Sequence, residues 1–124
     1  MIDEIILKSI DKEIRDIINS LNQIPFIQTL YSCSGHPETH QPQETPYVDI
    51  HYASPEKGLE FHKRILTEVP FINFRVLPIT IRDKSMEDIL KDSNHRVHYI
   101  YDNHNKQGVN SFWNAWRNII SEYL

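Results

Sequence analysis

The spacing of apolar residues along the chain predicts three amphipathic helices. The first covers residues 6–21 and ends before Pro25. The second begins at Ser54 and Pro55, because a serine N-cap followed by proline is a typical helix start, and its apolar stripe extends to Val69. The third is formed by the last residues of the sequence, where large apolar side chains recur at helical spacing: Trp113, Trp116, Ile119, Ile120 and Tyr123.

Runs rich in β-branched and aromatic residues predict four strands: residues 26–33, 47–53, 71–82 and 96–101. Pro78 interrupts the third strand and predicts an edge position or a bulge there, because proline cannot donate a hydrogen bond to a neighbouring strand. Between the third and fourth strands we expect a short helix that begins at Ser85 and ends near Lys91.

The order of these elements predicts the class of fold. The first two strands follow each other without a helix between them, so they can pair antiparallel. We therefore expect a single domain over residues 1–124 with an α+β fold. Its mixed or antiparallel sheet would have about four strands, with helices packed on one face.

Composition and charge limit the classes of function. Hydrophobic residues make up 40% of the 124 residues and charged residues 24%, as in an ordinary globular protein. A net charge of −4, with 13 lysines and arginines spread along the chain, argues against a strongly electrostatic nucleic-acid binder. The chain has a single cysteine and no signal-peptide pattern, which predicts a cytoplasmic protein. It also has no apolar run of about 20 residues, so we expect no membrane-spanning helix.

The candidate chemistry lies in the run Ser32-Cys33-Ser34-Gly35-His36, where a predicted strand meets a proline-rich loop. Ser32 and Ser34 would point to the same side of an extended chain, and Gly35 permits a close approach of the backbone to a ligand. His36 can donate or accept a proton near neutral pH. The run predicts a loop that binds a small polar or anionic ligand. Alternatively, the run is a structural turn whose serine hydroxyls form hydrogen bonds with the neighbouring backbone.

This run, followed by Pro46-Tyr47-Val48-Asp49-Ile50-His51-Tyr52 and a helix opening at Ser54, resembles the wybutosine-synthesis tRNA methyltransferase-like family. The resemblance covers residues 26–69, and its sharpest part is Ser32 to Gly35. Where the family has arginine, this chain has His36. The resemblance implies methyltransferase-like chemistry on tRNA or a small anionic substrate. Ser32, Ser34 and the Gly35 amide would bind it, and His36 or His51 would handle protons.

Two further interpretations of these residues stay open. Cys33, His36 and His40, completed by His51, offer thiolate and imidazole ligands of the kind that zinc prefers. Cys33 is otherwise expected to be a buried small apolar residue or a ligand-contacting residue of the loop. Asp49 shares a strand face with His51, and such a pair can orient a general base.

The remaining aromatic residues are expected to have structural roles. His62 lies on an apolar helix stripe and should be a core histidine with one hydrogen bond, whereas His95 and His104 should lie at the surface. His98 would join the polar residues Asp49 and His51 only if its strand is central in the sheet. The two tryptophans should serve packing. A protein-interaction domain without catalysis is the last alternative. Nucleic acid and a second copy of the chain stay open as partners, and the cofactor stays unknown.

Overall fold

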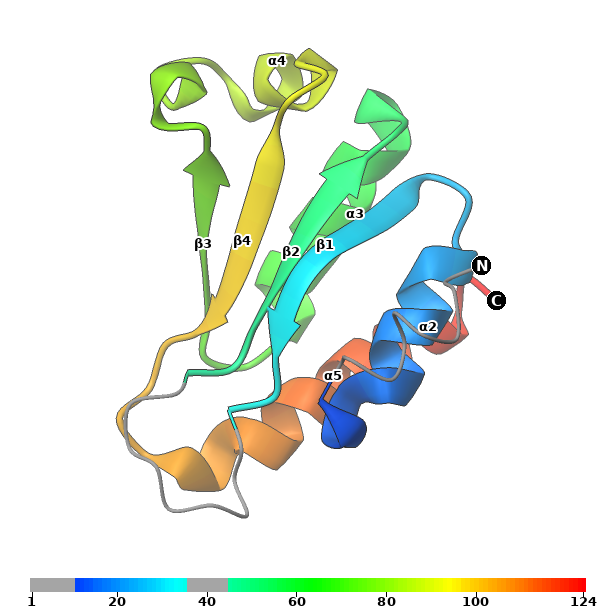
Figure 1. The fold of residues 1–124 in the computed structure, drawn as a ribbon, viewed down its shortest axis with the longest axis vertical. Helices are drawn as coiled ribbons and strands as arrows, with labels where there is room; N and C mark the ends of the chain where they lie inside the picture. The colour runs from blue at the N-terminus through cyan, green and yellow to red at the C-terminus, as the bar shows by residue number, and fades with distance from the viewer. Residues whose placement is uncertain (1–10, 36–44) are drawn as a thin grey trace.

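The computed structural model describes residues 11–35 and 45–124 and shows an α+β fold (Figure 1). Its sheet has the strand order β1-β2-β4-β3, and every neighbouring pair is antiparallel. The strands have these bounds: β1 Ile27–Cys33, β2 Tyr47–Tyr52, β3 Ile72–Leu77 and β4 Arg96–Tyr101. The predicted fold class is confirmed, and the sheet is antiparallel rather than mixed.

Within the described ranges, four α-helices accompany the sheet: α2 Arg15–Gln23, α3 Pro55–Glu68, α4 Met86–Lys91 and α5 Val109–Ser121. The predicted helix starts at Ser54 and Ser85 are confirmed. The Ser54 hydroxyl accepts a hydrogen bond from the Lys57 amide, and the Ser85 hydroxyl accepts one from the Asp88 amide. Short 3-10 segments precede α2 (Lys12–Ile14), follow β3 (Ile79–Ile81) and precede α5 (Lys106–Gly108).

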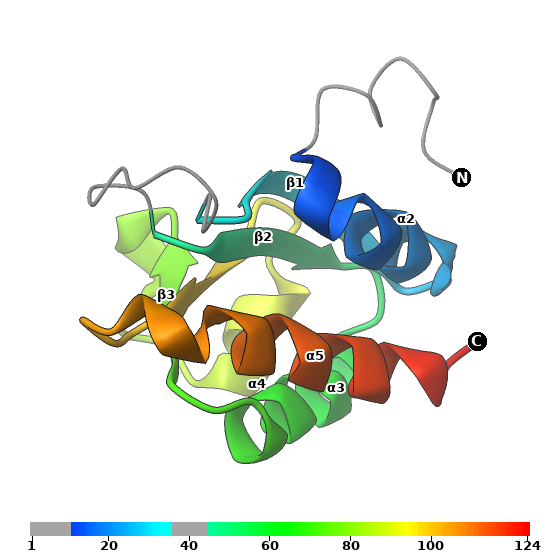
Figure 2. The same cartoon turned by 90° about the horizontal axis from the view of Figure 1, so that it is seen from below.

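The helices α2, α3 and α5 lie on one side of the sheet (Figure 2). Alternate residues of the two central strands point into this core, and they are almost fully buried: Val48, Ile50 and Tyr52 of β2 and Val97, Tyr99 and Tyr101 of β4. Trp113 and Trp116 of α5 belong to the same core, which confirms their predicted packing role. The residues between them in each strand face the other side of the sheet, which we call the open face.

Two predicted elements have different bounds. The third strand ends at Leu77 instead of Arg82, because Pro78 cannot donate to the ladder and the chain turns into a 3-10 segment. β3 is an edge strand, as the proline predicted. The first helix is shorter than predicted within the described residues, since α2 starts at Arg15 after a 3-10 turn, and residues 6–10 lie outside the described part.

The histidines are partly as predicted. His62 is buried and its Nδ1 hydrogen-bonds the Tyr99 hydroxyl at 2.7 Å, which confirms its place in the core. The predicted surface position of His95 is wrong: it is 1% exposed. Its Nε2 accepts a hydrogen bond from the Tyr52 amide and its Nδ1 donates to the Asp92 carbonyl, so the fold uses both ring nitrogens. His104 is exposed, as predicted.

None of the helices in the described ranges combines the length and the apolar character that a membrane crossing requires.

Candidate functional site

Strand pairing brings charged residues from three strands into one row on the open face. Asp49 of β2 lies opposite His98 of β4, and His98 lies opposite Arg75 of β3. Cross-strand partners share a face of the sheet, so all three side chains project away from the helices. In the adjoining row, Arg96 of β4 lies opposite Leu77 of β3.

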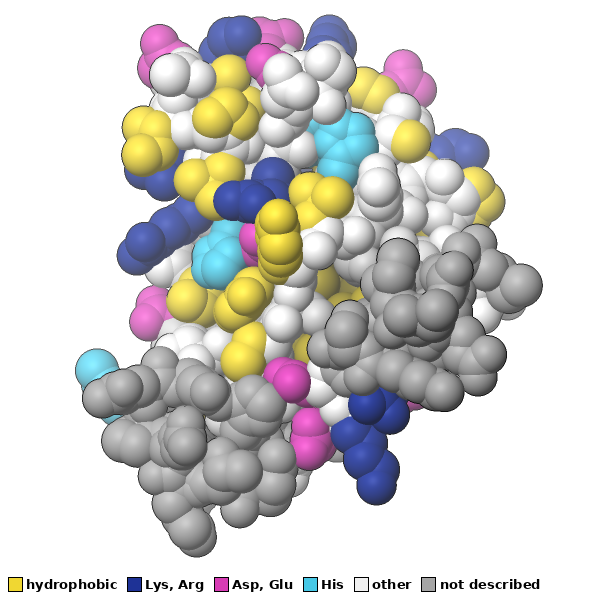
Figure 3. Space-filling model, viewed as in Figure 1, with side chains coloured by type: hydrophobic (Ala, Val, Ile, Leu, Met, Phe, Trp, Pro, Cys, Tyr) yellow, Lys and Arg dark blue, Asp and Glu magenta, His cyan; other side chains and the backbone are white. Residues whose placement is uncertain are grey.

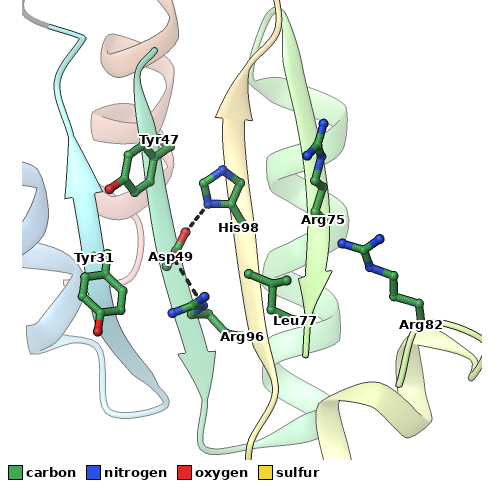
Figure 4. A pocket seen from close by; sticks show the side chains of 8 residues that line it. All are labelled: Tyr31, Tyr47, Asp49, Arg75, Leu77, Arg82, Arg96 and His98. Carbon is green, nitrogen blue, oxygen red and sulfur yellow. Dashed lines mark hydrogen bonds and ion pairs between the residues drawn. The ribbon is translucent and has the colours of Figure 1, made fainter. Parts of the chain in front are cut away.

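These five side chains line a hollow of about 430 Å³ (Figure 4). Tyr31 and Tyr47 border it on the β1 and β2 side, and Arg82 reaches it from beyond β3. Its volume is within the range of small-molecule sites. Figure 3 shows basic, acidic and histidine side chains meeting among apolar ones on this face. The hollow is the candidate site, and we call it the arginine hollow.

Asp49 is the buried charge at its centre. The residue is 4% exposed, its Oδ1 accepts a hydrogen bond of 2.5 Å from Nδ1 of His98, and its Oδ2 lies 3.3 Å from Nε of Arg96. Burial raises the pKa of this carboxyl, and the hydrogen bond from His98 and the charge of Arg96 partly offset that effect. The Arg96 contact is a charge attraction without hydrogen-bond geometry, because Nε of Arg96 is buried without a hydrogen-bond partner among the described residues.

Two aromatic side chains, Tyr31 and Tyr47, contact Arg96 and His98. The guanidinium carbon of Arg96 lies 5.3 Å from the ring centre of Tyr31, a cation–π contact. The ring centres of Tyr47 and His98 are 4.9 Å apart. The second ring nitrogen of His98 points away from Asp49 (Figure 4). The Tyr31 side is open to solvent, since that residue is 60% exposed.

Positive charge prevails in the arginine hollow. Among the described residues, three arginines and one aspartate line it, which gives a formal charge of +2 (3 − 1) with His98 neutral, although the whole chain carries −4. Nε of Arg82 donates to the Val76 carbonyl at 3.0 Å. In the described part of the chain, no acidic side chain pairs with Arg75 or Arg82. Both guanidinium groups are thus available to an anion.

The described residues of the predicted loop lie at the end of β1, and Ser34 and Gly35 among them are closely packed. Ser34 is fully buried, its amide donates to a carboxylate oxygen of Asp11 at 2.8 Å, and its carbonyl accepts from Nε1 of Trp113 at 3.2 Å. Gly35 has φ of 84°, and an added Cβ would lie 2.5 Å from Cγ of Pro46. Both residues thus serve the close packing of this turn.

Ser32 and Cys33 lie on opposite faces of β1. Ser32 pairs with the buried Val48 and so faces the helix side, whereas Cys33 pairs with Tyr47 and faces the open side. The thiol is half-buried, and burial raises the pKa of Cys33, with the nearby Asp11 adding to the effect. A raised pKa disfavours the thiolate that a nucleophile or metal ligand needs.

The structure pairs Asp49 with His98 and gives His51 another partner. Nδ1 of His51 donates to the His95 carbonyl at 2.8 Å, and the two imidazole rings stack with centres 4.2 Å apart. His36 and His40 lie outside the described residues, so the predicted zinc site stays a prediction. Within the described residues, no group of three or more possible metal ligands occurs.

Sequence reasoning named Asp49 but missed the arginines and Tyr31. His98 joins the cluster because β4 is central, which is the condition that the sequence set for it. Arg96 lies two positions before His98 in the same predicted strand, so the two side chains share a face. A central position for this strand would therefore have predicted that Arg96 also lies at the site. Arg75 and Arg82 are 7 positions apart in the sequence and meet only because the chain turns after β3.

The chain was compared with family models, with curated proteins and with solved structures. None of the three comparisons finds a match. The resemblance in the Ser32 to Gly35 run therefore stays a prediction.

Proposed function

We propose that the chain binds a small anionic ligand in the arginine hollow, and that a phosphate ester is the ligand class that fits it best. The observation that carries the proposal is the position of Arg75 and Arg82. Both lack an acidic partner in the described part of the chain, and both line a hollow whose one carboxylate already contacts His98 and Arg96.

Arginine suits this role for a chemical reason. Its planar guanidinium presents parallel N–H groups that match two phosphate oxygens, and such charge-assisted bonds are stronger than neutral ones. Asp49 contributes by holding Arg96 and His98 in fixed positions, so less conformational entropy is lost when the anion binds. The rings of Tyr31 and Tyr47 supply flat apolar surface beside the charges.

This proposal keeps the small anionic ligand that the sequence predicted and moves its site. The Ser34 amide and carbonyl bond Asp11 and Trp113, and Gly35 packs against Pro46, so these backbone groups are already used by the fold. Methyltransferase-like chemistry remains a prediction of the resemblance alone.

The test is calorimetric titration with inorganic phosphate and with phenyl phosphate at low ionic strength. We expect both to bind, and the double variant Arg75→Gln/Arg82→Gln to weaken binding by about tenfold or more, since a hydrogen bond to a charged group contributes roughly 1.5–3 kcal/mol. Lys57→Gln/Lys63→Gln removes the same charge from exposed positions of α3 and should leave binding nearly unchanged. Equal losses in both double variants, or no binding by the unaltered chain, would contradict the proposal.

A further inference from the structure

A second hollow adjoins the arginine hollow at the edge of the sheet. It has a volume of about 390 Å³ and shares two lining residues with the first, Arg75 and Arg82. Its other walls are Phe74 and Val76 of β3, Met86 and Ile89 of α4, and one further cation, Lys84. We call it the β3-edge hollow. The shared arginines mean that a ligand bound to them touches both hollows.

The position of Arg82 explains how the two hollows meet. Its Nε donates to the carbonyl of Val76, and β3 has no neighbouring strand on that side among the described strands. The guanidinium of Arg82 is therefore anchored at the strand edge, between the open face and the side that faces α4. Arg75 projects from the strand between Phe74 and Val76, which belong to the opposite face.

The apolar walls are built into the fold. Val76 and Ile89 are buried in a small cluster with Ile81, and Phe74 and Met86 pack against it while they remain partly accessible. An apolar group placed there would contact these side chains and leave water, which is favourable in proportion to the area buried. A simple inorganic anion would make no use of this surface.

We propose that the ligand of the arginine hollow is an amphipathic anion, with its anionic head on Arg75 and Arg82 and an apolar arm in the β3-edge hollow. The inference rests on the proposed function and specifies its substrate class. The observation behind it is the sharing of two arginines by a charged hollow and an apolar one. An alkyl phosphate is the simplest molecule of this class.

The test is a titration series with inorganic, ethyl, butyl and hexyl phosphate at constant ionic strength. Each methylene that becomes buried should tighten binding by up to about fourfold, so hexyl phosphate should bind at least tenfold more tightly than ethyl phosphate. In the Met86→Gln variant, the increase in affinity with alkyl chain length should disappear, while the affinity for inorganic phosphate stays unchanged. Leu66→Gln, an exposed position on α3, is the matched control and should retain the gain.

A spectroscopic readout makes the test independent of how well the variant folds. The chain has two methionines, Met1 and Met86, so methyl-labelled methionine gives two signals, and Met86→Leu assigns them. Hexyl phosphate should shift the Met86 methyl signal, and inorganic phosphate should shift it much less.

The outcomes separate the two proposals. Phosphate binding without dependence on chain length, or a chain-length gain without a Met86 shift, would overturn the apolar arm and leave the anion site standing. Absence of binding by every member of the series would overturn the anion site, and the inference would fall with it.

Discussion

Nδ1 of His98 lies 2.5 Å from Oδ1 of Asp49, and this hydrogen bond joins the two central strands on the open face of the sheet. An ionised carboxylate can only accept, so the proton of the bond is on Nδ1 of His98. A neutral His98 then presents an unprotonated Nε2. The buried aspartate thereby fixes both the orientation and the tautomer of the histidine that lines the arginine hollow.

Asp49→Ala should lower the free energy of unfolding by about 2 kcal/mol, because the substitution removes the acceptor of the His98 hydrogen bond and leaves a gap at a buried position. Urea denaturation at pH 7 measures the loss. Arg75→Gln is the control: Arg75 lines the same hollow but is exposed and has no acidic partner within the described residues, so its loss should stay within about 0.5 kcal/mol. Equal losses would show that the Asp49 contacts do not stabilise the fold.

Stability should fall in mild acid because of His62. Burial lowers the pKa of this imidazole to about 4, below the value of 6.5 expected in the unfolded chain. The unfolded chain therefore binds the proton first, so the stabilisation is complete above pH 6.5 and is lost as the pH falls to about 4. The loss amounts to about 3 kcal/mol at most.

Urea midpoints measured between pH 7 and pH 4 test this prediction. His62→Gln removes the titrating group and should flatten the dependence on pH. His95, whose pKa is also lowered by burial, should leave a smaller slope of the same sign. Identical slopes in the variant and the unaltered chain would exclude His62 as the cause.

Gly35→Ala should destabilise the chain by about 2 kcal/mol. The residue has φ of 84°, which alanine adopts at a cost, and the new Cβ would meet the ring of Pro46 at 2.5 Å. The double variant Gly35→Ala/Pro46→Ala relieves the contact with the ring but not the backbone strain, so it should recover only part of the loss relative to Pro46→Ala. A Gly35→Ala variant as stable as the unaltered chain in urea would rule out this packing role.

Two tryptophans of α5 offer a comparison of hydrogen bonding. Nε1 of Trp113 donates to the buried Ser34 carbonyl, whereas Nε1 of Trp116 has no hydrogen-bond partner among the described residues. Trp113→Phe should therefore cost more stability than Trp116→Phe by roughly 1 kcal/mol, although both shorten a buried ring. Thermal and urea unfolding of the two variants test the order, and the reverse order would show that packing outweighs the hydrogen bond.

Much of the fold was predictable because it depends on local patterns. The serine caps at Ser54 and Ser85 mark helix starts directly. Pro78 predicted an edge position or a bulge, and the structure shows the edge position. The alternation in residues 96–101 places Val97, Tyr99 and Tyr101 on one side of the strand, and the structure shows that this side of β4 faces the core. His95 was misplaced because its burial comes from bonds to Tyr52, 43 positions earlier, which no local pattern records.

The site was less predictable because strand pairing creates it. Asp49, His98 and Arg75 meet through the order β2-β4-β3, in which the crossover through α3 leaves β4 between two strands that precede it in the chain. The sequence offered Ser32 to Gly35 as the candidate because the run is compact. Ser34, in the middle of this run, is anchored by hydrogen bonds to Asp11 and Trp113, which lie far from it in the sequence.

The most direct test of the anion site is a map of amide and arginine side-chain NMR shifts as inorganic phosphate is added. The account predicts that the largest shifts fall on β2, β3 and β4 at Asp49, Arg75 and His98, and on the Nε–H group of Arg82. Shifts that concentrate instead at Ser32 to Gly35, or no shifts at saturating phosphate, would contradict it.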